Sequence, residues 1–391
     1  MAANYWPDEY LQKQCTAQQA MKRLKSGQRI FVGSSCGEPQ HLVNVLVNEA
    51  PHLSDLEIVR LMSLENSPLT RLATRKGDYD QFSIRSIYQG SAATRHLETN
   101  RPFITPMNLS AVPNLFKKRH LPINAALVQT SPPDDFGWMS LGISVDVGMA
   151  AVKAADLVIV QVNSYMPRVL GHSFIHANDV DIVVEKDEDL LTIEQLPEFD
   201  SAHRIARLVA NLIEDGSTFQ LGLGATPKAI LLALSEKNDL GVHTQFIIDG
   251  IMNLVSMGVI TNNYKGLNDG KLVATNAVGS RNLYEFVHDN PSIEFYPSDY
   301  VNNPVIIGQH NKMVAINMVM EMDLTGQAAV DALPHNYFAG VSSMLDFMRG
   351  ASVCPEGKSI LLIPSTSIDG NSSRIVPQIS GGVVVPRTDA S

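Results

Sequence analysis

The chain has 391 residues, of which 45% are hydrophobic and 18% are charged. This composition predicts a globular protein with a substantial core and room for two or three domains. The formal net charge is -10, which argues against nonspecific binding of nucleic acid because that requires a basic surface. Binding of a small anion remains compatible with this charge, since helix N-termini and loop amides can supply a local field.

The cysteines and the absence of long apolar segments bear on the compartment. Cys15, Cys36 and Cys354 stand far apart with no C-x-x-C pair, so neither a zinc site nor a disulfide framework is predicted, and a reducing compartment fits best. The segment Met1–Lys13 lacks the apolar stretch of a signal peptide. No apolar run reaches membrane-spanning length. We therefore expect a cytoplasmic protein without a membrane or nucleic-acid partner.

The first half of the chain alternates strand and helix patterns. A Gly/Ser loop, Gly33–Gly37, follows the first strand, Pro39 begins a helix, and Val147–Ala155 has a second helical pattern. The remaining apolar runs are continuous, as in parallel sheets that are covered on both faces. The strands are predicted at Gln28–Val32, Leu56–Leu61, Asn124–Gln129, Leu157–Val162 and Val180–Glu185.

The second half begins after a polar stretch around Pro197 that reads as a linker. It contains a helix at Ala202–Ile213 and strands at Thr218–Leu221, Lys312–Met318 and Ser359–Ile363. The repeated strand–loop–helix units predict an α/β protein with two similar open α/β domains and mostly parallel sheets. We place these domains at residues 1–190 and 200–391, with the active-site cleft between them.

A glycine-containing loop, Gly222–Pro227, connects a predicted strand to a predicted helix. Glycines in that position let backbone amides approach an anion, and the helix N-terminus adds a favourable field. A third glycine is missing at the spacing of a dinucleotide fingerprint, so that interpretation is weak and a tight turn explains the loop equally well. Pro227 suits the first turn of the helix, where its missing N–H costs nothing.

The segment Gly241-Val242-His243-Thr244-Gln245 resembles the active-site segment of the acetyl-CoA hydrolase/4-hydroxybutyrate CoA-transferase family, the class I CoA-transferases. Gly222–Pro227 resembles the G-[IL]-G-A-[IT]-P loop of that family, and similar motifs cover nearly the whole chain. The other matching segments include Ser131–Gly142, Gln161–Arg168, Tyr300–Asn302, Ala315–Asn317, Asp323–Gln327 and Ser373–Pro377. The resemblance implies a CoA-transferase fold of the NagB/RpiA-like kind and a homodimer or higher homo-oligomer.

The same resemblance implies coenzyme A or an acyl-CoA as substrate, a short-chain carboxylate as its partner, and no metal. The residues that match the family's CoA-contacting positions are Gly222, Leu223, Gly224, Ala225, Thr226, Asn317, Gly340 and Ser342. His243 matches a positioning residue, and a hydrogen-bonded structural histidine is the simpler interpretation of it.

Gln245 occupies the catalytic position, where the family pattern G-[IV]-H-T-E has a glutamate. In the family that carboxylate attacks the acyl-CoA thioester, and CoA then attacks the resulting anhydride to leave a glutamyl-CoA thioester. A neutral amide is a far poorer nucleophile. Three hypotheses remain: an engineered Glu→Gln change, a natural substitution in a protein that binds acyl-CoA without turnover, or activation of water by another residue.

A second motif, Tyr337–Gly350, resembles the family pattern G-[IV]-G-G-Q-x-D-F-x-R-G. Ser342 and Ser343 replace its two central glycines and Met344 replaces its glutamine, whereas Gly340 and Asp346 match. The added Cβ atoms restrict positive φ angles and close approach of a ligand to the backbone. Departures in both site motifs favour natural divergence over a single engineered change.

Three other features receive structural interpretations. His172 and His176 have the i, i+4 spacing of helical metal ligands, but Phe174-Ile175 between them looks like a strand, so we predict no metal site. Cys36 is expected to be a small buried residue. Family members usually continue past the equivalent of Asp389 into a V-T-E-Y-G segment, so the second domain is either truncated at its end or a natural short form.

The predicted function is therefore that of an acyl-CoA:carboxylate CoA-transferase or acyl-CoA hydrolase of short-chain substrates, impaired by Gln245. The alternative is a catalytically degenerate CoA- or acyl-CoA-binding protein with a regulatory or scaffolding role. One sequence does not rank the acyl groups or acceptors.

Overall fold

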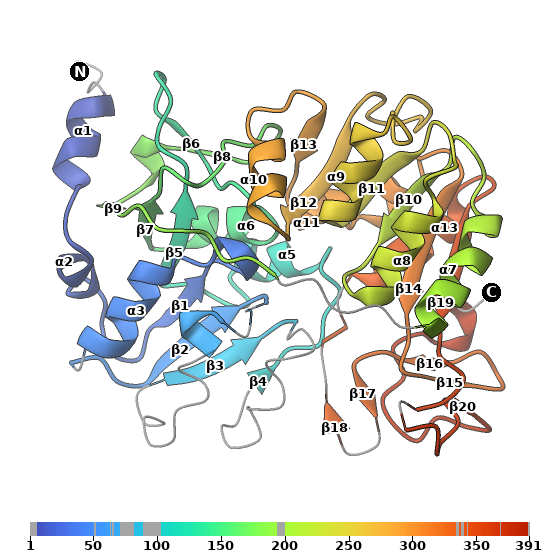
Figure 1. The fold of residues 1–391 in the computed structure, drawn as a ribbon. Helices are drawn as coiled ribbons and strands as arrows, with labels where there is room; N and C mark the ends of the chain where they lie inside the picture. The colour runs from blue at the N-terminus through green and yellow to red at the C-terminus, as the bar shows by residue number, and fades with distance from the viewer. Residues whose placement is uncertain are drawn as a thin grey trace.

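The structure is a computed structural model that describes residues 6–50, 52–62, 64, 66–70, 82–88, 103–193, 200–333, 336–337, 340–341, 343–367 and 369–389. Two α/β units lie side by side, the first coloured blue to green and the second yellow to red (Figure 1). Each unit is built around one large parallel sheet. This arrangement confirms the predicted fold class of two open α/β domains.

The first sheet has seven parallel strands in the order β4-β3-β2-β1-β5-β7-β9. The chain winds outward from β1 in both directions, so the order reverses between β1 and β5, which is the doubly wound pattern. The strands are β1 (Arg29–Val32), β2 (Leu56–Arg60), β3 (Phe82–Ser86), β4 (Phe103–Ile104), β5 (Ala125–Thr130), β7 (Leu157–Val162) and β9 (Ile182–Glu185).

Helices cover both faces of the first sheet. One face packs on α2 (Ala17–Met21) and α3 (Gln40–Glu49), and the other on α5 (Val112–Lys117) and α6 (Gly148–Ala154). The N-terminal helix α1 (Trp6–Lys13) lies beside β9, to which Tyr10 donates a hydrogen bond at Glu185 (2.9 Å). Double coverage explains the continuous apolar character of these strands.

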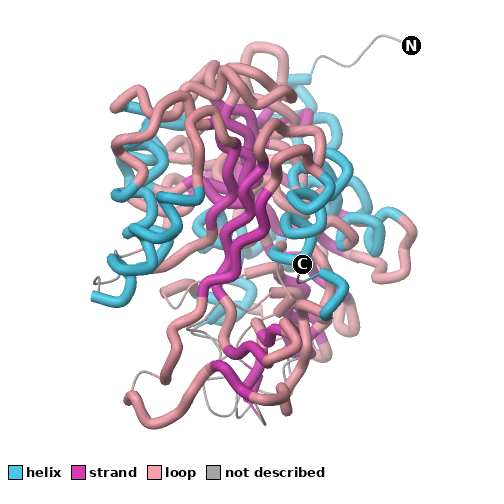
Figure 2. The backbone as a smooth tube through the Cα atoms, turned by 90° about the vertical axis from the view of Figure 1, so that its right-hand side faces the viewer, coloured by secondary structure: helices cyan, strands magenta, loops and turns pink. Residues whose placement is uncertain are grey.

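The second sheet has six parallel strands in the order β13-β12-β11-β10-β14-β19. Figure 2 shows its strands running between two layers of helices. The strands are β10 (Thr218–Leu221), β11 (Gly241–Ile247), β12 (Leu272–Ala277), β13 (Ile293–Phe295), β14 (Met313–Met318) and β19 (Lys358–Leu362).

A different set of helices covers each face of the second sheet. One layer contains α7 (Asp200–Leu212), α8 (Ala225–Ala233), α9 (Asp249–Ser256) and α10 (Arg281–Val287). The other contains α11 (Ser298–Val301), α12 (Pro304–Ile307) and α13 (Met344–Val353). The second layer covers the face of β11 that carries Gln245, as the contacts below show.

Short strands form three small sheets outside the two large ones. In the first, β6 (Trp138–Ser140) pairs with β8 (Phe174–His176). In the second, β15 (Glu321–Asp323) lies between β16 (Ala328–Ala329) and β20 (Ile375–Val376). In the third, β17 (Ala332–Leu333) pairs with β18 (Asn336–Tyr337). The strand expected around Phe174-Ile175 is thus confirmed. Because this segment is a strand and not a helix, His172 and His176 do not share a helix face as i, i+4 metal ligands would.

Most of the predicted elements are confirmed to within a residue or two. Leu157–Val162 and Thr218–Leu221 are strands with the predicted bounds, Pro227 lies in the first turn of α8, and Cys36 is buried. The loop Gly33–Gly37 contains a short 3-10 turn, Ser35–Gly37. The domain limits at residues 190 and 200 stay a prediction. Among the described helices, none has the length and apolar character needed to cross a bilayer.

The two units share an apolar core and several polar contacts. One hydrophobic cluster includes Phe31 and Val147 from the first unit together with Phe219 and Val242 from the second. A β-bridge joins Gly171 to Phe295 of β13. These contacts fix the carboxyl edge of the second sheet against the first unit, and this edge contains the candidate site.

Candidate functional site

Gln245 lies near the carboxyl end of β11 with its side chain only 2% exposed. Its side-chain oxygen Oε1 accepts a hydrogen bond from the Ser343 hydroxyl (2.6 Å), and its backbone oxygen accepts one from Thr275 Oγ1 (2.8 Å). Its Nε2 is buried and has no hydrogen-bond partner within the described residues. A buried amide with unused donors is unfavourable, so this nitrogen is a candidate donor to a ligand oxygen.

Ser343 belongs to the N-terminus of α13, directly over Gln245. It is the N-cap residue of this ten-residue helix, yet its hydroxyl makes no capping bond to the described backbone and binds Gln245 instead. The positive end of the helix dipole favours a negative charge or a carbonyl oxygen at this place. The site therefore places the side chain of Gln245 beside a helix N-terminus whose electrostatic field favours an anionic group.

The loop Gly222–Thr226 follows β10, which is the strand next to β11, so it lies at the same edge of the sheet as Gln245. Gly224 is the N-cap of α8 with φ of 128°, which a residue with a Cβ rarely adopts. A Cβ at Gly222 would have no atom within 4 Å, so the backbone there is open to a ligand. The buried Thr226 hydroxyl has no partner in the part of the chain that the structure describes.

Asn317 is the penultimate residue of β14, the strand on the other side of β10 from β11. Its amide exchanges two hydrogen bonds with the Gln220 amide, at 3.2 and 3.3 Å, and Gln220 also accepts one from the Ile316 amide (3.2 Å). Asn317 is therefore held by a neighbouring strand. Gln220 was not predicted from the sequence, although an amide within an otherwise apolar strand was the available signal.

Gly340 packs against the end of β3 in the first unit. A Cβ at this position would lie 2.4 Å from the Ile87 carbonyl oxygen and 3.1 Å from Tyr88 Cα. The glycine is thus required for the close approach of the two units, and its contact with CoA stays a prediction. Ser342 lies outside the described residues, and its contact with CoA stays a prediction.

Two buried carboxylates that the sequence did not mark as site residues connect the units near this edge. Asp146 Oδ2 accepts hydrogen bonds from Ser34 (2.5 Å) and from Asn276 of β12 (2.9 Å). Asp346 of α13 accepts bonds from the Ser110 hydroxyl (2.7 Å) and amide (3.1 Å), and burial raises its pKa to about 6. Both contacts hold the second unit against the first beside the site.

Three buried titratable side chains, His243, His310 and Lys265, lie further from the carboxyl edge of the second sheet than Gln245. His243 is buried and donates a hydrogen bond from Nε2 to the Val301 carbonyl (2.8 Å), which confirms its structural interpretation. The His310 ring lies 4.4 Å from the His243 ring, centroid to centroid. Burial and the charge of Lys265 lower the pKa of His310 to about 3, and burial lowers the pKa of Lys265 to about 7.

We expect these histidines to make the protein sensitive to acid. The folded pKa of His310 lies below the unfolded value, so between about pH 6.5 and pH 3 the unfolded chain binds an extra proton and stability falls as pH falls. His310→Gln should flatten the dependence by about 1.4 kcal/mol for each pH unit below 6, measured by urea unfolding from pH 7 to pH 4. The exposed His120→Gln is the matched control. Equal slopes in both variants would contradict this assignment.

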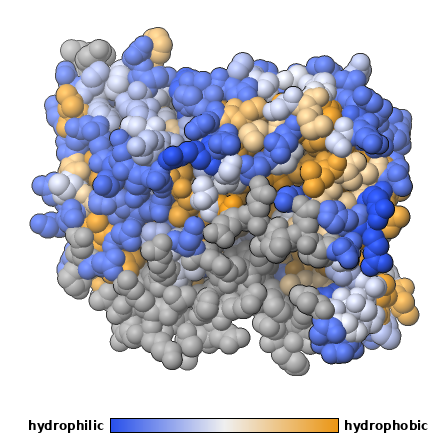
Figure 3. All heavy atoms as spheres, in the orientation of Figure 1, coloured by the Kyte–Doolittle hydropathy of each residue, from blue (hydrophilic) through white to orange (hydrophobic). Residues whose placement is uncertain are grey.

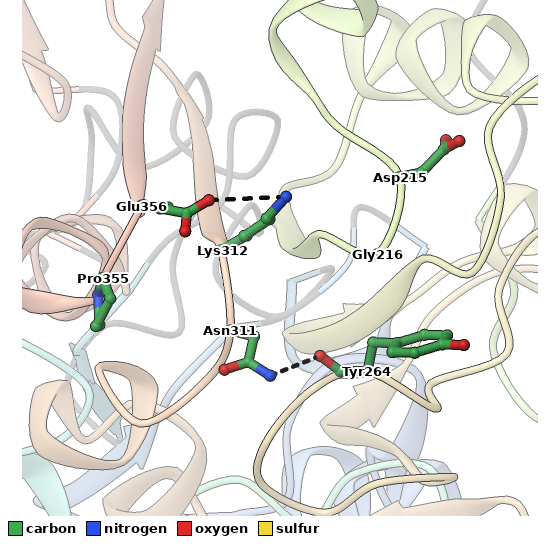
Figure 4. Close-up of a pocket in the computed structure, with 7 residues that line it drawn as sticks. All are labelled: Asp215, Gly216, Tyr264, Asn311, Lys312, Pro355 and Glu356. Carbon is green, nitrogen blue, oxygen red and sulfur yellow. Dashed lines mark hydrogen bonds and ion pairs between the residues drawn. The ribbon is translucent and has the colours of Figure 1, made fainter.

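A surface pocket of about 310 Å³ lies elsewhere, between Asp215, Tyr264, Asn311, Lys312 and Glu356 (Figure 4). These residues precede β10, β12, β14 and β19, so the pocket is at the amino edge of the sheet and Gln245 is at the carboxyl edge. Lys312 is paired with Glu214 (2.9 Å) and Glu356 (3.7 Å). The pocket is therefore separate from the candidate site.

Of the predicted set, the structure places Gln245, the loop Gly222–Thr226 and Asn317 at one edge of the second sheet, whereas the nearest neighbours of a Cβ at Gly340 are Ile87 and Tyr88 of the first unit. Comparison with known proteins gives matches along nearly the whole chain. Residues 3–194 match the family model described as the acetyl-CoA hydrolase/transferase N-terminal domain, and residues 279–391 match the C-terminal domain of the same family.

Two curated relatives illustrate the match. The chain is 40% identical to the 4-hydroxybutyrate coenzyme A transferase of Clostridium kluyveri, covering 97% of this chain and 88% of the relative. It is 34% identical to the succinyl-CoA:acetate/propanoyl-CoA:succinate CoA transferase of Fasciola hepatica, covering 93% of this chain and 76% of the relative.

Solved structures agree with this relationship. RipA from Yersinia pestis superposes with a TM-score of 0.89 and 32% identity, covering 99% of this chain and 89% of that chain. The 4-hydroxybutyrate CoA-transferase of Porphyromonas gingivalis superposes with a TM-score of 0.82 and 33% identity, covering 97% and 88%. By fold and by sequence along its length, this protein belongs to the acetyl-CoA hydrolase/transferase family, a family of enzymes that includes CoA transferases.

Proposed function

We propose that the protein binds a short-chain acyl-CoA and acts, at residue 245, as a slow acyl-CoA:carboxylate CoA-transferase or acyl-CoA hydrolase. The observation that carries this proposal is the position of Gln245, buried at the carboxyl edge of β11 beside the loop Gly222–Thr226 and the N-terminus of α13. The names of the two curated relatives support short-chain substrates, since they refer to 4-hydroxybutyrate and to succinyl-CoA, acetate and propanoyl-CoA.

Gln245 limits the chemistry at this position. A carboxylate can attack a thioester carbonyl and release CoA thiolate, but a neutral amide has no charge to donate and reacts far more slowly. The amide can change if CoA thiolate attacks its carbon and the nitrogen leaves as ammonia after taking up a proton; water then cleaves the resulting thioester to glutamate and free CoA. The mass of the peptide from His243 to Asp249 after incubation with CoA distinguishes glutamine from glutamate.

A second candidate function is that of an acyl-CoA-binding protein without turnover, in a regulatory or scaffolding role. It is favoured by one observation, the contact between Gln245 and Ser343, which occupies the side-chain oxygen at the reactive position. The two candidates share the ligand and differ in catalysis. They are therefore separated by measuring binding and turnover on the same sample.

The decisive experiment follows CoA transfer from acetyl-CoA and from butyryl-CoA to a panel of carboxylates, with CoA binding measured in parallel by calorimetry. Binding with measurable turnover supports the slow enzyme. Binding with no turnover above the uncatalysed rate supports the acyl-CoA-binding protein. Absence of binding to CoA and to both thioesters would contradict both.

We expect Gly222→Ala to weaken CoA binding while leaving stability almost unchanged. A Cβ at Gly222 meets no atom within 4 Å in the protein, so folding has nothing to lose, whereas a ligand that approaches the backbone would meet the new methyl group. The dissociation constant should rise about tenfold, the equivalent of about 1.4 kcal/mol. Gly382→Ala, whose Cβ would make one ordinary contact at 3.8 Å with Asp331 Oδ1, is the control and should bind normally.

For the assembly and the compartment, we propose a cytoplasmic homodimer or higher homo-oligomer. Hydrophobic side chains gather over α8 and α9 on the face shown in Figure 3. Leu232 of α8, Met257 after α9, and Leu208 and Leu212 of α7 are all exposed, and a patch of this kind supports a contact between copies. Sedimentation equilibrium tests the assembly, and cell fractionation tests the compartment.

A further inference from the structure

The contact between Gln245 and Ser343 joins two parts of the second unit that are 98 residues apart in the chain. One end is a central strand and the other is the N-cap residue of α13. Both side chains are almost inaccessible, at 2% and 5% exposure. The 2.6 Å bond is therefore shielded from competing water, where a hydrogen bond is stronger than at the surface.

Within the described residues, the Ser343 hydroxyl does not cap its own helix. An N-cap serine ordinarily accepts a hydrogen bond from the backbone of its own helix, and Ser343 makes no such bond to the described residues of α13. Its hydrogen is given to Gln245 Oε1, which leaves Gln245 Nε2 buried without a partner inside the described structure. In the structure the amide therefore faces Ser343 with its oxygen.

We propose that Ser343 is the positioning residue for the side chain at 245, and that its hydroxyl holds the oxygen through which that side chain would act on an acyl group. With glutamine, the bond orients the amide so that Nε2 is the group available to an acyl oxygen. With a carboxylate at 245, the same bond would stabilise the charged ground state and slow its attack. The catalytic part of this inference rests on the proposed function; the coupling of the two residues does not.

The coupling is tested first by thermal unfolding of Ser343→Ala, Gln245→Ala and the double variant. Ser343→Ala should lower Tm by about 2 °C when residue 245 is glutamine and by clearly less when it is already alanine, because the alanine background has no such bond to lose. Ser352→Ala removes another α13 hydroxyl, bonded to the Arg349 carbonyl, and should shift Tm equally in both backgrounds. Equal shifts for Ser343→Ala in the two backgrounds would overturn the proposal.

The catalytic consequence is tested in Gln245→Glu with and without Ser343→Ala. Removal of the hydroxyl should raise kcat about threefold to tenfold with little change in KM, because a charge-assisted hydrogen bond to the ground-state carboxylate is lost. The acidic limb of the pH–rate profile should move upward by about one pH unit. Ser343→Thr keeps a hydroxyl and should restore the slower rate and the original limb.

An unchanged kcat and an unchanged acidic limb on removal of the hydroxyl would overturn the catalytic part of the inference. If Gln245→Glu transfers no CoA in any of these backgrounds, the proposed transferase function fails instead. The thermal unfolding cycle still decides whether Ser343 and Gln245 are coupled, since it requires no activity.

Discussion

We expect Gln245→Glu to raise kcat/KM for CoA transfer by about 10³-fold or more, since loss or gain of a catalytic nucleophile changes rates on that scale. The change replaces NH₂ by O⁻ with almost the same shape at a buried position. The N-terminus of α13 lies beside it and stabilises a negative charge there. Transfer from butyryl-CoA to acetate, followed by release of acetyl-CoA, measures the effect.

Two variants show whether the gain belongs to this position. Gln220→Glu places a carboxylate on the adjacent strand β10 and should give no activity, because that amide is engaged with Asn317. Gln245→Asp introduces the same charge as the glutamate variant on a side chain that is one methylene shorter, and should give much less activity than the glutamate. If the glutamate variant binds CoA and shows no gain, residue 245 is not the reacting position.

The second large effect is expected from Gly171→Ala, which should lower Tm by about 5 °C or more. Gly171 has φ of 96°, and a Cβ would lie 2.6 Å from the Phe295 carbonyl oxygen and 2.8 Å from its nitrogen. Strain at a positive φ and displacement of a strand backbone each cost roughly 1–3 kcal/mol. The substitution would disrupt the β-bridge between the two units, where the backbones of Leu170 and His172 each make a 2.8 Å hydrogen bond with that of Phe295.

Gly270→Ala separates the two causes. Gly270 also has a positive φ of 73°, but its Cβ would meet no atom within 4 Å. It should therefore show the backbone strain alone and a smaller drop in Tm, measured by differential scanning calorimetry. Equal drops in both variants would mean that contact with Phe295 contributes nothing.

The sequence predicted the parallel sheets well because their strands are buried on both faces. Leu157–Val162 and Thr218–Leu221 are continuous apolar or half-apolar runs bounded by turn residues, and such local patterns survive folding unchanged. The short antiparallel pair β17 and β18 was not predicted, since two-residue strands leave no periodic signal.

The site was predicted in its residue types but not in its contacts. Motif resemblance marked Gln245 and the departure at Ser343, yet their hydrogen bond depends on how α13 packs on β11. Gly340 was assigned to a ligand, and its nearest neighbour in the structure is the Ile87 backbone of the other unit. Asp146 was missed because its partners, Ser34 and Asn276, are distant in sequence. Such long-range partners follow from the tertiary structure rather than from spacing.

The apolar core that both units share has a consequence for synthesis on the ribosome. The first sheet is complete at Glu185, whereas Phe219, Val242 and other members of the same cluster emerge later. The nascent first unit therefore displays hydrophobic surface until the second unit packs on it, and this interval is when aggregation and chaperone binding occur. Expression of the first unit alone would prolong that exposure, and the yield of folded protein depends on how quickly the second sheet forms.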